Sequence, residues 1–437
     1  MTTPNNKRTV AVIGSGPAGA VAAIALKRQG FEPTLYEKVD PIEAVKEAMR
    51  TGEDVSLQFS TIGGGFSVLA NGLKALQHLG LYDDILALNI DKLLAMNFMR
   101  MDGSDLAVKP TAKAGEIDAR HMLRSTFHNA IMKAVHRANI KTYGGKKLIN
   151  LEQDENGVTV WFEDGTVITA DFVVGADGIH STTRKLVFPE ALKPIVFGIG
   201  YTAVLDRGTL ADGTVVEFDY QMGAYVDGVE GRMVFISRCG PKDGEVFVAD
   251  MDNSKWLDQN EDWRPVTDLP KETAKLAEMV ESWGAPRSVV TCTRHVKRIT
   301  PANIYDLPDL STFYKGRVVL VGDAAHGTIP FYGQGLNQAL EDAGVLADLW
   351  GHFGANEYEK TFALYNKIRV PRVQLCAANA RTTAKRMKAG NKRGERIGRF
   401  FMKIAFGITN FFGLDDEVYY HDFRDDVKKA VPDIQFV

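Results

Sequence analysis

The chain has 437 residues, of which 45% are hydrophobic and 24% charged, a composition that is ordinary for a globular protein and predicts two or three domains. Its 52 lysines and arginines against 55 aspartates and glutamates give a formal net charge of −3, which argues against a nucleic-acid-binding protein. The cysteines Cys239, Cys292 and Cys376 form neither a disulfide framework nor a metal-binding spacing. We therefore expect a reducing, cytoplasmic location and no metal site.

An uncharged run of seventeen residues, 10–26, lies near the N-terminus and raises the question of a signal peptide or a membrane span. Gly14, Gly16, Pro17 and Gly19 interrupt the middle of this run and would break a spanning helix. We therefore interpret the run as a buried strand, a glycine turn and a buried helix. With a second short strand at 34–36, these elements make a βαβ unit.

The turn of this unit, residues 14–19, fits the pattern G-x-G-x-x-G between a strand and a helix. Gly14 permits a tight turn, Gly16 lets the backbone approach a pyrophosphate, and Gly19 lets the helix pack against the strand. Glu37 follows the second strand, twenty-three residues after Gly14, where a carboxylate can accept hydrogen bonds from a ribose. The pattern predicts dinucleotide binding but does not separate NAD from FAD.

Further elements follow in chain order. Alternating runs on both sides of Asp164-Gly165 predict a hairpin over residues 157–170. Two short apolar runs that end near glycine, 172–174 and 318–321, predict buried central strands. Aromatic and β-branched runs with glycine turns over residues 195–297 predict a separate antiparallel sheet, and residues 334–350 have helical periodicity.

The C-terminal region combines basic and apolar residues at helical spacing. Residues 385–403 contain eight basic residues and one acidic residue. The apolar positions are Ile397, Phe400, Phe401, Ile404, Ile408 and Phe411. We favour a helix laid over the body of the protein with a solvated basic edge. The alternatives are a helix at a membrane surface and a lid over an apolar substrate.

Two later segments make the prediction more specific. The first is GADGIHS at 175–181, followed by Arg184. The second is GDAAH at 322–326, which continues to GQGLN at 333–337 and to Glu341-Asp342. Together with the first glycine motif, and in this order, they resemble the single-component FAD-dependent aromatic hydroxylases, the flavoprotein monooxygenases related to salicylate and para-hydroxybenzoate hydroxylases. The resemblance extends from about residue 10 to residue 342.

The resemblance implies an FAD site built from several distant segments. Asp323 would accept a hydrogen bond from the ribityl chain, and the helix that starts near Gln334 would direct its positive end towards the flavin ring. We interpret His326 as structural. The implied cofactor-binding residues are Gly14, Gly16, Pro17, Ala18, Gly19, Glu37, Lys38, Gly64, Gly65, Arg120, Asp177, Asp323, Pro330, Gly333, Gly335, Leu336 and Asn337.

The implied fold class is α/β, with a Rossmann-like FAD-binding domain, a second antiparallel-sheet substrate domain and a C-terminal helical segment. We expect the FAD-binding domain to be discontinuous, with residues 1–75, 105–190 and 298–375. The substrate domain would comprise residues 76–104 and 191–297, and the helical region residues 376–437.

The resemblance also implies an activity. NAD(P)H as cosubstrate would reduce FAD, and dioxygen would form a C4a-hydroperoxyflavin that hydroxylates an aromatic or heteroaromatic small molecule. The apolar C-terminal region favours a bulky, apolar substrate. Because no second G-x-G-x-x-G is followed by a strand and helix, the nicotinamide would bind transiently over a groove. The alternatives are a flavin epoxidase, halogenase or reductase on the same scaffold, and a non-enzymatic escort protein of this fold.

Several residues depart from the family pattern, and the roles of two others stay undecided. The family often has arginine where Lys38 stands, and we hypothesise that Arg50, in the unaligned stretch 39–62, replaces it. An arginine found in many fungal relatives is missing after residues 201–205. Tyr201 and Tyr225 are the candidate catalytic residues on the substrate sheet. For each tyrosine, a role in packing alone is an equal alternative to contact with the substrate.

Overall fold

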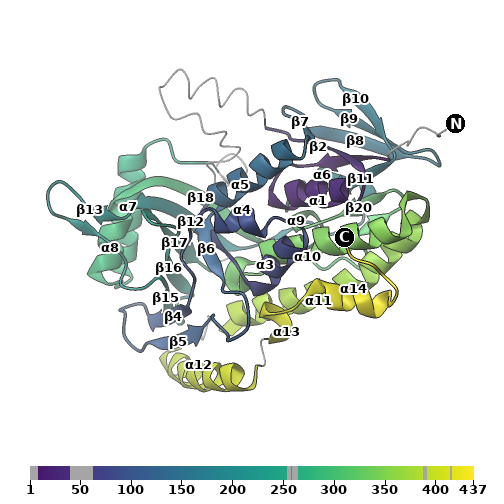
Figure 1. Cartoon of the computed structure of the whole chain (residues 1–437). Coiled ribbons are helices and arrows are strands. Elements are labelled where there is room, and N and C mark those ends of the chain that lie inside the picture. Colours follow the sequence, from purple (N-terminus) through teal and green to yellow (C-terminus); the bar gives the residue numbers. More distant parts are fainter. Residues whose placement is uncertain (1–7, 40–62, 253–256, 258–263, 387–390, 414–415) are drawn as a thin grey trace.

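Two β-sheets lie side by side in the computed structural model of this protein (Figure 1). The structure describes residues 8–39, 63–252, 257, 264–386, 391–413 and 416–437. Arg50 and most of the stretch 39–62 therefore lie outside the described residues. None of the helices in the described part has the length and apolar character needed to cross a bilayer.

The first sheet has six strands in the order β19-β20-β11-β1-β2-β7, and only the β19–β20 pair is antiparallel. Its central strands are short runs of mostly apolar residues, as expected for strands that are buried on both faces. The predicted buried strands at 172–174 and 318–321 are neighbours in this sheet. Its strands are β1 (Thr9–Ile13), β2 (Glu32–Tyr36), β7 (Lys141–Tyr143), β11 (Phe172–Gly175), β19 (Tyr314–Lys315) and β20 (Val318–Leu320).

Helices and a small antiparallel sheet cover the six-stranded sheet. Helix α1 packs against both α5 and α10, and α10 also contacts α3, α11 and α14. The predicted hairpin forms β9 and β10. The elements are α1 (Pro17–Arg28), α3 (Ala70–His78), α4 (Tyr82–Leu86), α5 (Arg124–Arg137), β8 (Leu148–Gln153), β9 (Val158–Phe162), β10 (Val167–Ala170), α6 (Thr182–Val187), α9 (Asp323–His326), η1 (Pro330–Tyr332), α10 (Gly335–Phe353), η2 (Ala355–Glu357), α11 (Tyr358–Arg386) and α14 (Phe423–Ala430).

The second sheet has seven strands in the order β18-β12-β17-β16-β15-β4-β5, antiparallel except for the β15–β4 pair. Helices α7 (Leu269–Ser282) and α8 (Arg287–Arg294) pack on one of its faces. Its strands are β4 (Ala95–Arg100), β5 (Ala107–Pro110), β12 (Ile195–Asp206), β15 (Met222–Asp227), β16 (Arg232–Arg238), β17 (Asp243–Asp250) and β18 (Val296–Asp306). The remaining strands form two short pairs, β3 (Gly65–Val68) with β6 (Arg120–Leu123) and β13 (Gly208–Thr209) with β14 (Val215–Val216).

Packing differs from the expected domain boundaries at three points. Strand β18, most of which we assigned to the FAD-binding domain, pairs with β12 in the seven-stranded sheet. The other two differences concern short segments. Residues 76–90, which we assigned to the substrate domain, place Leu76, Leu79 and Ile85 in the core around the six-stranded sheet. Strand β5, which we assigned to the FAD-binding domain, pairs with β4 in the seven-stranded sheet. Both segments are short insertions between larger elements, and their apolar pattern does not show which sheet they join.

The C-terminal region contains the expected helix, α12 (Lys392–Phe412), followed by the short α13 (Asp416–Tyr419). As favoured, the helix lies against the body and its basic residues Lys392, Arg393 and Arg396 are exposed, but most of its apolar positions are exposed as well. Arg399, Met402 and Phe406 lie towards the body of the protein, whereas Phe400 and Phe401 are each 62% exposed. The buried guanidinium of Arg399 bonds to Asp105, which fixes the Arg399 side of the helix against the body. The side chain of Phe411 is not among those that the structure describes.

A buried charge cluster joins α10 to α11. The Arg369 guanidinium donates to Glu341 over 2.5 Å and to Asp342 over 2.7 Å, and Arg372 donates to Glu341 over 2.9 Å. Burial alone would raise the pKa of Glu341, but the two guanidinium groups lower it well below its usual value. The resulting stabilisation is present at neutral pH and is lost only in acid, as the pH falls through the lowered pKa.

We expect the substitution Arg369→Met to lower the free energy of unfolding by about 3–5 kcal/mol, because it leaves the buried Asp342 without a guanidinium partner and Glu341 with only that of Arg372. Urea denaturation followed by circular dichroism measures the change. The control is Lys360→Met in the same helix, whose exposed pair with Glu357 should contribute less than about 1 kcal/mol. Equal losses for both variants would contradict the structural role of the cluster.

Candidate active site

The glycine turn after β1 lies where its sequence motif predicts. Gly14 has a φ of +99°, and its amide donates to the carbonyl of Tyr36 over 2.8 Å. A Cβ on Gly14 would lie 2.5 Å from the Ala176 carbonyl oxygen, and one on Gly19 would lie 2.0 Å from the Gly14 oxygen. A Cβ on Gly16 would meet nothing within 4 Å. Gly14 and Gly19 therefore serve chain packing, and Gly16 faces open space at the N-terminus of α1, where N–H groups are free for a phosphate.

Glu37 fixes this turn at the end of β2. Its carboxylate accepts from the Ser15 amide over 2.9 Å, from the Ser15 hydroxyl over 3.1 Å and from the Val39 amide over 3.1 Å. Lys38 is exposed beside it. Both residues flank the turn, but neither side chain lines the large cavity described below.

Asp323 begins α9, directly beyond the carboxyl end of β20. This edge of a parallel sheet is where α/β folds bind ligands. The Asp323 carboxylate lines the cavity, together with the loop that leads into α10. A Cβ on Gly335 would lie 3.9 Å from Asp323 Oδ1, and Gly333 has a φ of +64°, which favours glycine. The expected residues Pro17, Ala18, Pro330 and Leu336 also line the cavity.

Asn337 holds this loop from inside the protein. It is fully buried, accepts from the Leu69 amide over 2.9 Å and donates to the carbonyls of Gly333 over 2.8 Å and Ser67 over 3.1 Å. The side chain thus ties the loop before α10 to the strand β3. Asn337 positions cavity residues without lining the cavity itself.

His326 is buried, as expected for a structural residue. Its Nε2 lies 2.6 Å from Asp342 Oδ2, and the same carboxylate oxygen accepts from the Gly322 amide over 2.9 Å. The buried charge cluster of α10 therefore also holds the loop that carries Asp323. His326 does not line the cavity.

The arginine that lines the cavity is not the expected Arg120 but Arg124, four residues further along the chain. Arg120 donates to the Ile90 carbonyl and does not line the cavity. Arg124, at the start of α5, does line it. Burial lowers the pKa of Arg124, and the carboxylates of Asp323 and Glu37 oppose that shift. Sequence analysis missed Arg124, although it lies only four residues after Arg120. A cation between these two carboxylates suits the pyrophosphate of a dinucleotide.

The segment with Asp177 and Arg184 supports the cavity from behind. Asp177 accepts from the amides of Thr182 over 2.7 Å and Thr183 over 2.9 Å, which caps α6. The buried Arg184 donates to the carbonyls of Ala324 over 3.0 Å and Ile179 over 2.7 Å. Both side chains thus brace loops whose backbone reaches the cavity, and neither lines it.

Tyr201 and Tyr225 lie on the opposite face of the seven-stranded sheet. Tyr225 is 1% exposed in the apolar core between the sheet and helices α7 and α8, and Tyr201 packs against the same core. Their strand neighbours Thr202, Ala224 and Val226 line the cavity instead. The prediction that these tyrosines contact substrate is therefore not supported. Alternation along a strand sets which residues share a face, but the sequence does not show which face the cavity takes.

One cavity of about 1330 Å³ connects the glycine turn, Arg124, Asp323 and the loop before α10. It exceeds the usual 300–1,000 Å³ of a small-molecule pocket, so it has room for a dinucleotide and a second ligand. From the glycine turn it passes under the seven-stranded sheet, where its wall is apolar, and reaches α12. The sheet residues of this wall are Met96, Phe98, Met222, Met233, Phe235, Phe247 and Ile304.

A polar cluster interrupts the apolar wall beside Gly64 and Gly65. His121 lies with Nδ1 2.9 Å from the Ser67 hydroxyl and Nε2 2.8 Å from the Ser237 hydroxyl. The buried carboxylate of Glu245 lies 3.7 Å from the same Nε2. A Cβ on Gly64 would overlap Glu245 Oε1 at 1.7 Å, which explains why glycine stands there. Sequence analysis missed both His121 and Glu245, because neither belongs to a motif.

Known proteins share this architecture. The family model described as "FAD binding domain" matches residues 7–193 and 256–380. The 6-hydroxynicotinate 3-monooxygenase of Pseudomonas fluorescens is 27% identical over 83% of this chain and 88% of its own. The 6-methylsalicylate 1-monooxygenase of Aspergillus terreus is 29% identical over 86% and 82%. A salicylate hydroxylase in complex with substrate has the same fold, with a TM-score of 0.72, 22% identity and coverage of 97% and 98%.

The residues of the cavity fit a bound FAD. Gly16 leaves the space that a Cβ would fill, the N-terminus of α1 and Arg124 suit phosphates, and Asp323 and the loop before α10 lie further along the same cavity. The fit to FAD therefore rests on residues of this chain and not on its similarity to known proteins.

We expect Gly16→Val to abolish FAD retention while leaving the apoprotein folded, because the new side chain enters open space that the cofactor needs. Absorbance in the flavin bands and thermal unfolding of the apoprotein measure the two effects. The matched control, Gly19→Val, should instead destabilise the fold, since its Cβ would meet backbone at 2.0 Å. If both variants keep FAD, the turn does not bind the cofactor.

We expect Asp323→Ala to weaken FAD binding by roughly 10- to 100-fold, which is the contribution of a hydrogen bond to a charged group. Titration of the apoprotein with FAD measures the affinity. His326→Gln keeps a hydrogen-bond donor near Asp342 and should bind FAD nearly as tightly as the wild type. Equal affinities for all three proteins would show that Asp323 does not contact the cofactor.

Proposed function

The chain belongs to the FAD binding domain family, and from this premise we propose that it is a monooxygenase that uses NAD(P)H and dioxygen to hydroxylate an aromatic or heteroaromatic small molecule. The observation that carries the proposal is the single cavity, which joins the dinucleotide turn to an apolar chamber under the second sheet. A cofactor that only stabilised the fold would not need such a chamber.

The chain's own residues would bind the cofactor at three points. The α1 N-terminus and Arg124 would hold the phosphates, Asp323 would hold the ribityl hydroxyls, and the backbone around Gly333 and Gly335 would lie against the ring. The chemistry that FAD supplies when bound is the acceptance of electrons from NAD(P)H and the activation of dioxygen. The protein contributes position, charge and the exclusion of water.

The apolar wall would bind the substrate, which supports a bulky, apolar ring system. Aromatic and methionine side chains from β4, β15, β16 and β17 offer large, adaptable contact areas to such a molecule. They also keep the site dry, which strengthens the electrostatic contacts of polar groups within it.

Glu245 and His121 would orient the substrate at the polar end. Glu245 is the one acidic residue that the seven-stranded sheet places on the cavity wall within the described residues. Its carboxylate can accept a hydrogen bond from a phenolic O–H or a heterocyclic N–H, which increases the electron density of the ring. His121, held by Ser67 and Ser237, lies within reach to stabilise the carboxylate.

Phenols, indoles and quinolones, supplied to the FAD-loaded protein, test the activity. We expect at least one class to stimulate NAD(P)H oxidation and to yield a product heavier by one oxygen atom, identified by mass spectrometry. Oxidation that gives only hydrogen peroxide with every compound would contradict the proposed hydroxylation.

With the best substrate, we expect Glu245→Gln to lower product formation by about 100-fold, because a neutral amide cannot accept the substrate proton. FAD content and thermal stability should stay near wild type, since glutamine has the same shape. Tyr225→Phe is the control on the opposite face and should leave turnover unchanged. A large loss with Tyr225→Phe, or none with Glu245→Gln, would reverse the assignment of the two faces.

A further inference from the structure

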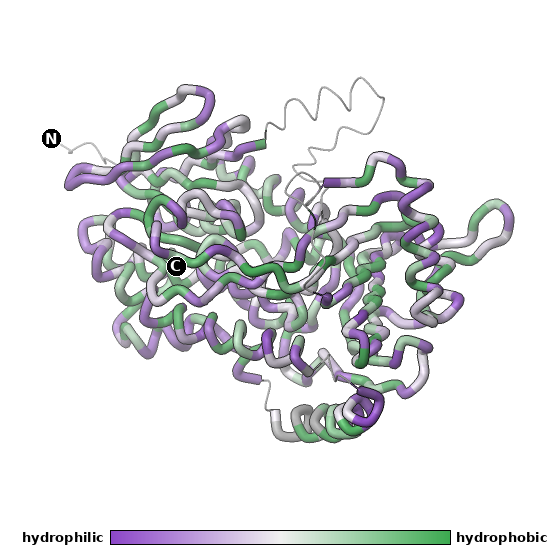
Figure 2. The backbone as a smooth tube through the Cα atoms, turned by 180° about the vertical axis from the view of Figure 1, so that it is seen from behind, coloured by the Kyte–Doolittle hydropathy of each residue, from purple (hydrophilic) through white to green (hydrophobic). Residues whose placement is uncertain are grey.

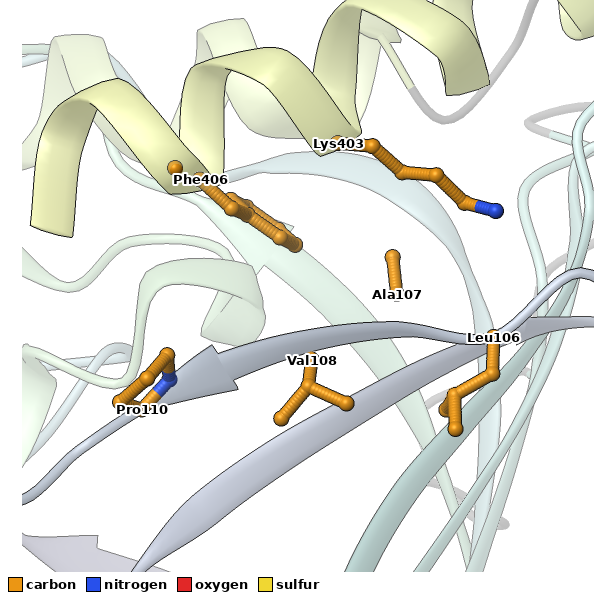
Figure 3. A pocket seen from close by; sticks show the side chains of 7 residues that line it. Leu106, Ala107, Val108, Pro110, Lys403 and Phe406 are labelled. Atoms are coloured by element: carbon orange, nitrogen blue, oxygen red, sulfur yellow. The ribbon is translucent and has the colours of Figure 1, made fainter.

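Helix α12 lies at the periphery of the molecule, against β5 (Figure 1). Arg399 bonds to Asp105 over 2.6 Å, and Lys403 pairs with the same carboxylate. Figure 3 shows Lys403 and Phe406 extending from α12 towards β5, where Ala107 points back at the helix. A cavity of about 340 Å³ lies between them. The helix is thus fixed to the body along one face.

The opposite face of α12 is apolar and exposed. The spacing of three and four residues puts five large side chains on one side of the helix. These are Ile397, Phe400, Phe401, Ile404 and Ile408, which are 43–62% exposed. Among the other described helices, only α4 and α11 expose a large hydrophobic residue, one each, Leu86 and Leu375. Figure 2 shows this helix at the edge of the molecule, with purple at one end and green and pale turns along the rest of its coloured part.

Basic residues border this apolar face. Lys392, Arg393 and Arg396 are exposed on the first turns of α12, and the helix has one acidic residue, Glu395. A helix that combines an exposed phenylalanine face with a basic border has the composition of helices that lie in the interface of a membrane. The basic border attracts anionic headgroups, whereas it would repel the same border of a second copy of this chain.

We propose that α12 docks this protein on the surface of a membrane with anionic headgroups, with Phe400 and Phe401 inserted between the lipids. The inference goes beyond the proposed function and does not depend on it. Phe401, Ile404 and Ile408 belong both to the exposed face and to the wall of the large cavity. Docking therefore places the α12 end of that cavity at the lipid, where apolar molecules concentrate.

Flotation of the FAD-loaded, full-length protein with vesicles tests the proposal. We expect the protein to float with vesicles of phosphatidylcholine and phosphatidylserine, and less with phosphatidylcholine alone. The double substitution Phe400→Ser with Phe401→Ser should weaken binding by about tenfold or more. Arg393→Gln with Arg396→Gln should remove most of the preference for phosphatidylserine, and high salt should have the same effect on the wild type.

The matched control removes similar exposed apolar side chains elsewhere. Leu192 and Val215 are 68% and 62% exposed, so Leu192→Ser with Val215→Ser should bind vesicles like the wild type. FAD content and thermal unfolding show that each variant is folded, and neither readout requires turnover.

Three results would overturn the proposal. The first is a wild-type protein that floats with neither kind of vesicle. The second is equal binding by wild type and the Phe400→Ser, Phe401→Ser variant. The third is a dimer, detected by light scattering, that this variant dissociates, because the exposed face would then be covered by a second copy. A protein that floats but hydroxylates nothing would contradict only the proposed function.

Discussion

The buried charge cluster of α10 is the constraint on which the candidate site depends. Glu341 and Asp342 are 0% exposed and are tolerated only because Arg369, Arg372 and His326 surround them. Through Asp342 the cluster holds the Gly322 amide, and the same helix begins at the loop with Gly333 and Gly335. One ionic cluster thus sets the distance between the two loops that face the expected cofactor.

Sequence patterns predicted the first βαβ unit, the hairpin and the central strands, because each has a period or a turn that only one backbone conformation satisfies. They also predicted Asp323 at a strand end. They failed for residues that act through space. Arg124, His121 and Glu245 come from three elements that carry no motif, and only the folded chain brings them together. Tyr225 shows the same limit, since strand alternation assigns residues to two faces without saying which face is hollow.

The C-terminal helix shows how a single contact overrides a pattern. Its periodicity predicts an amphipathic helix, and the usual expectation is that the apolar side turns inward. Here the buried guanidinium of Arg399 bonds to Asp105 and holds the side of the helix that carries Met402 and Phe406 against the body. Phe400 and Phe401 are left in contact with water, which is unfavourable for large apolar side chains.

The strand order of the first sheet has a consequence for biosynthesis. Val10 pairs with Phe172, and Val173 pairs with Val318, so the two central contacts join segments far apart in the sequence. The nascent chain therefore leaves the ribosome with β1 lacking one partner until β11 has been made, and the sheet closes only after β20. Such late pairing makes folding slow and leaves apolar strand edges accessible to chaperones during translation.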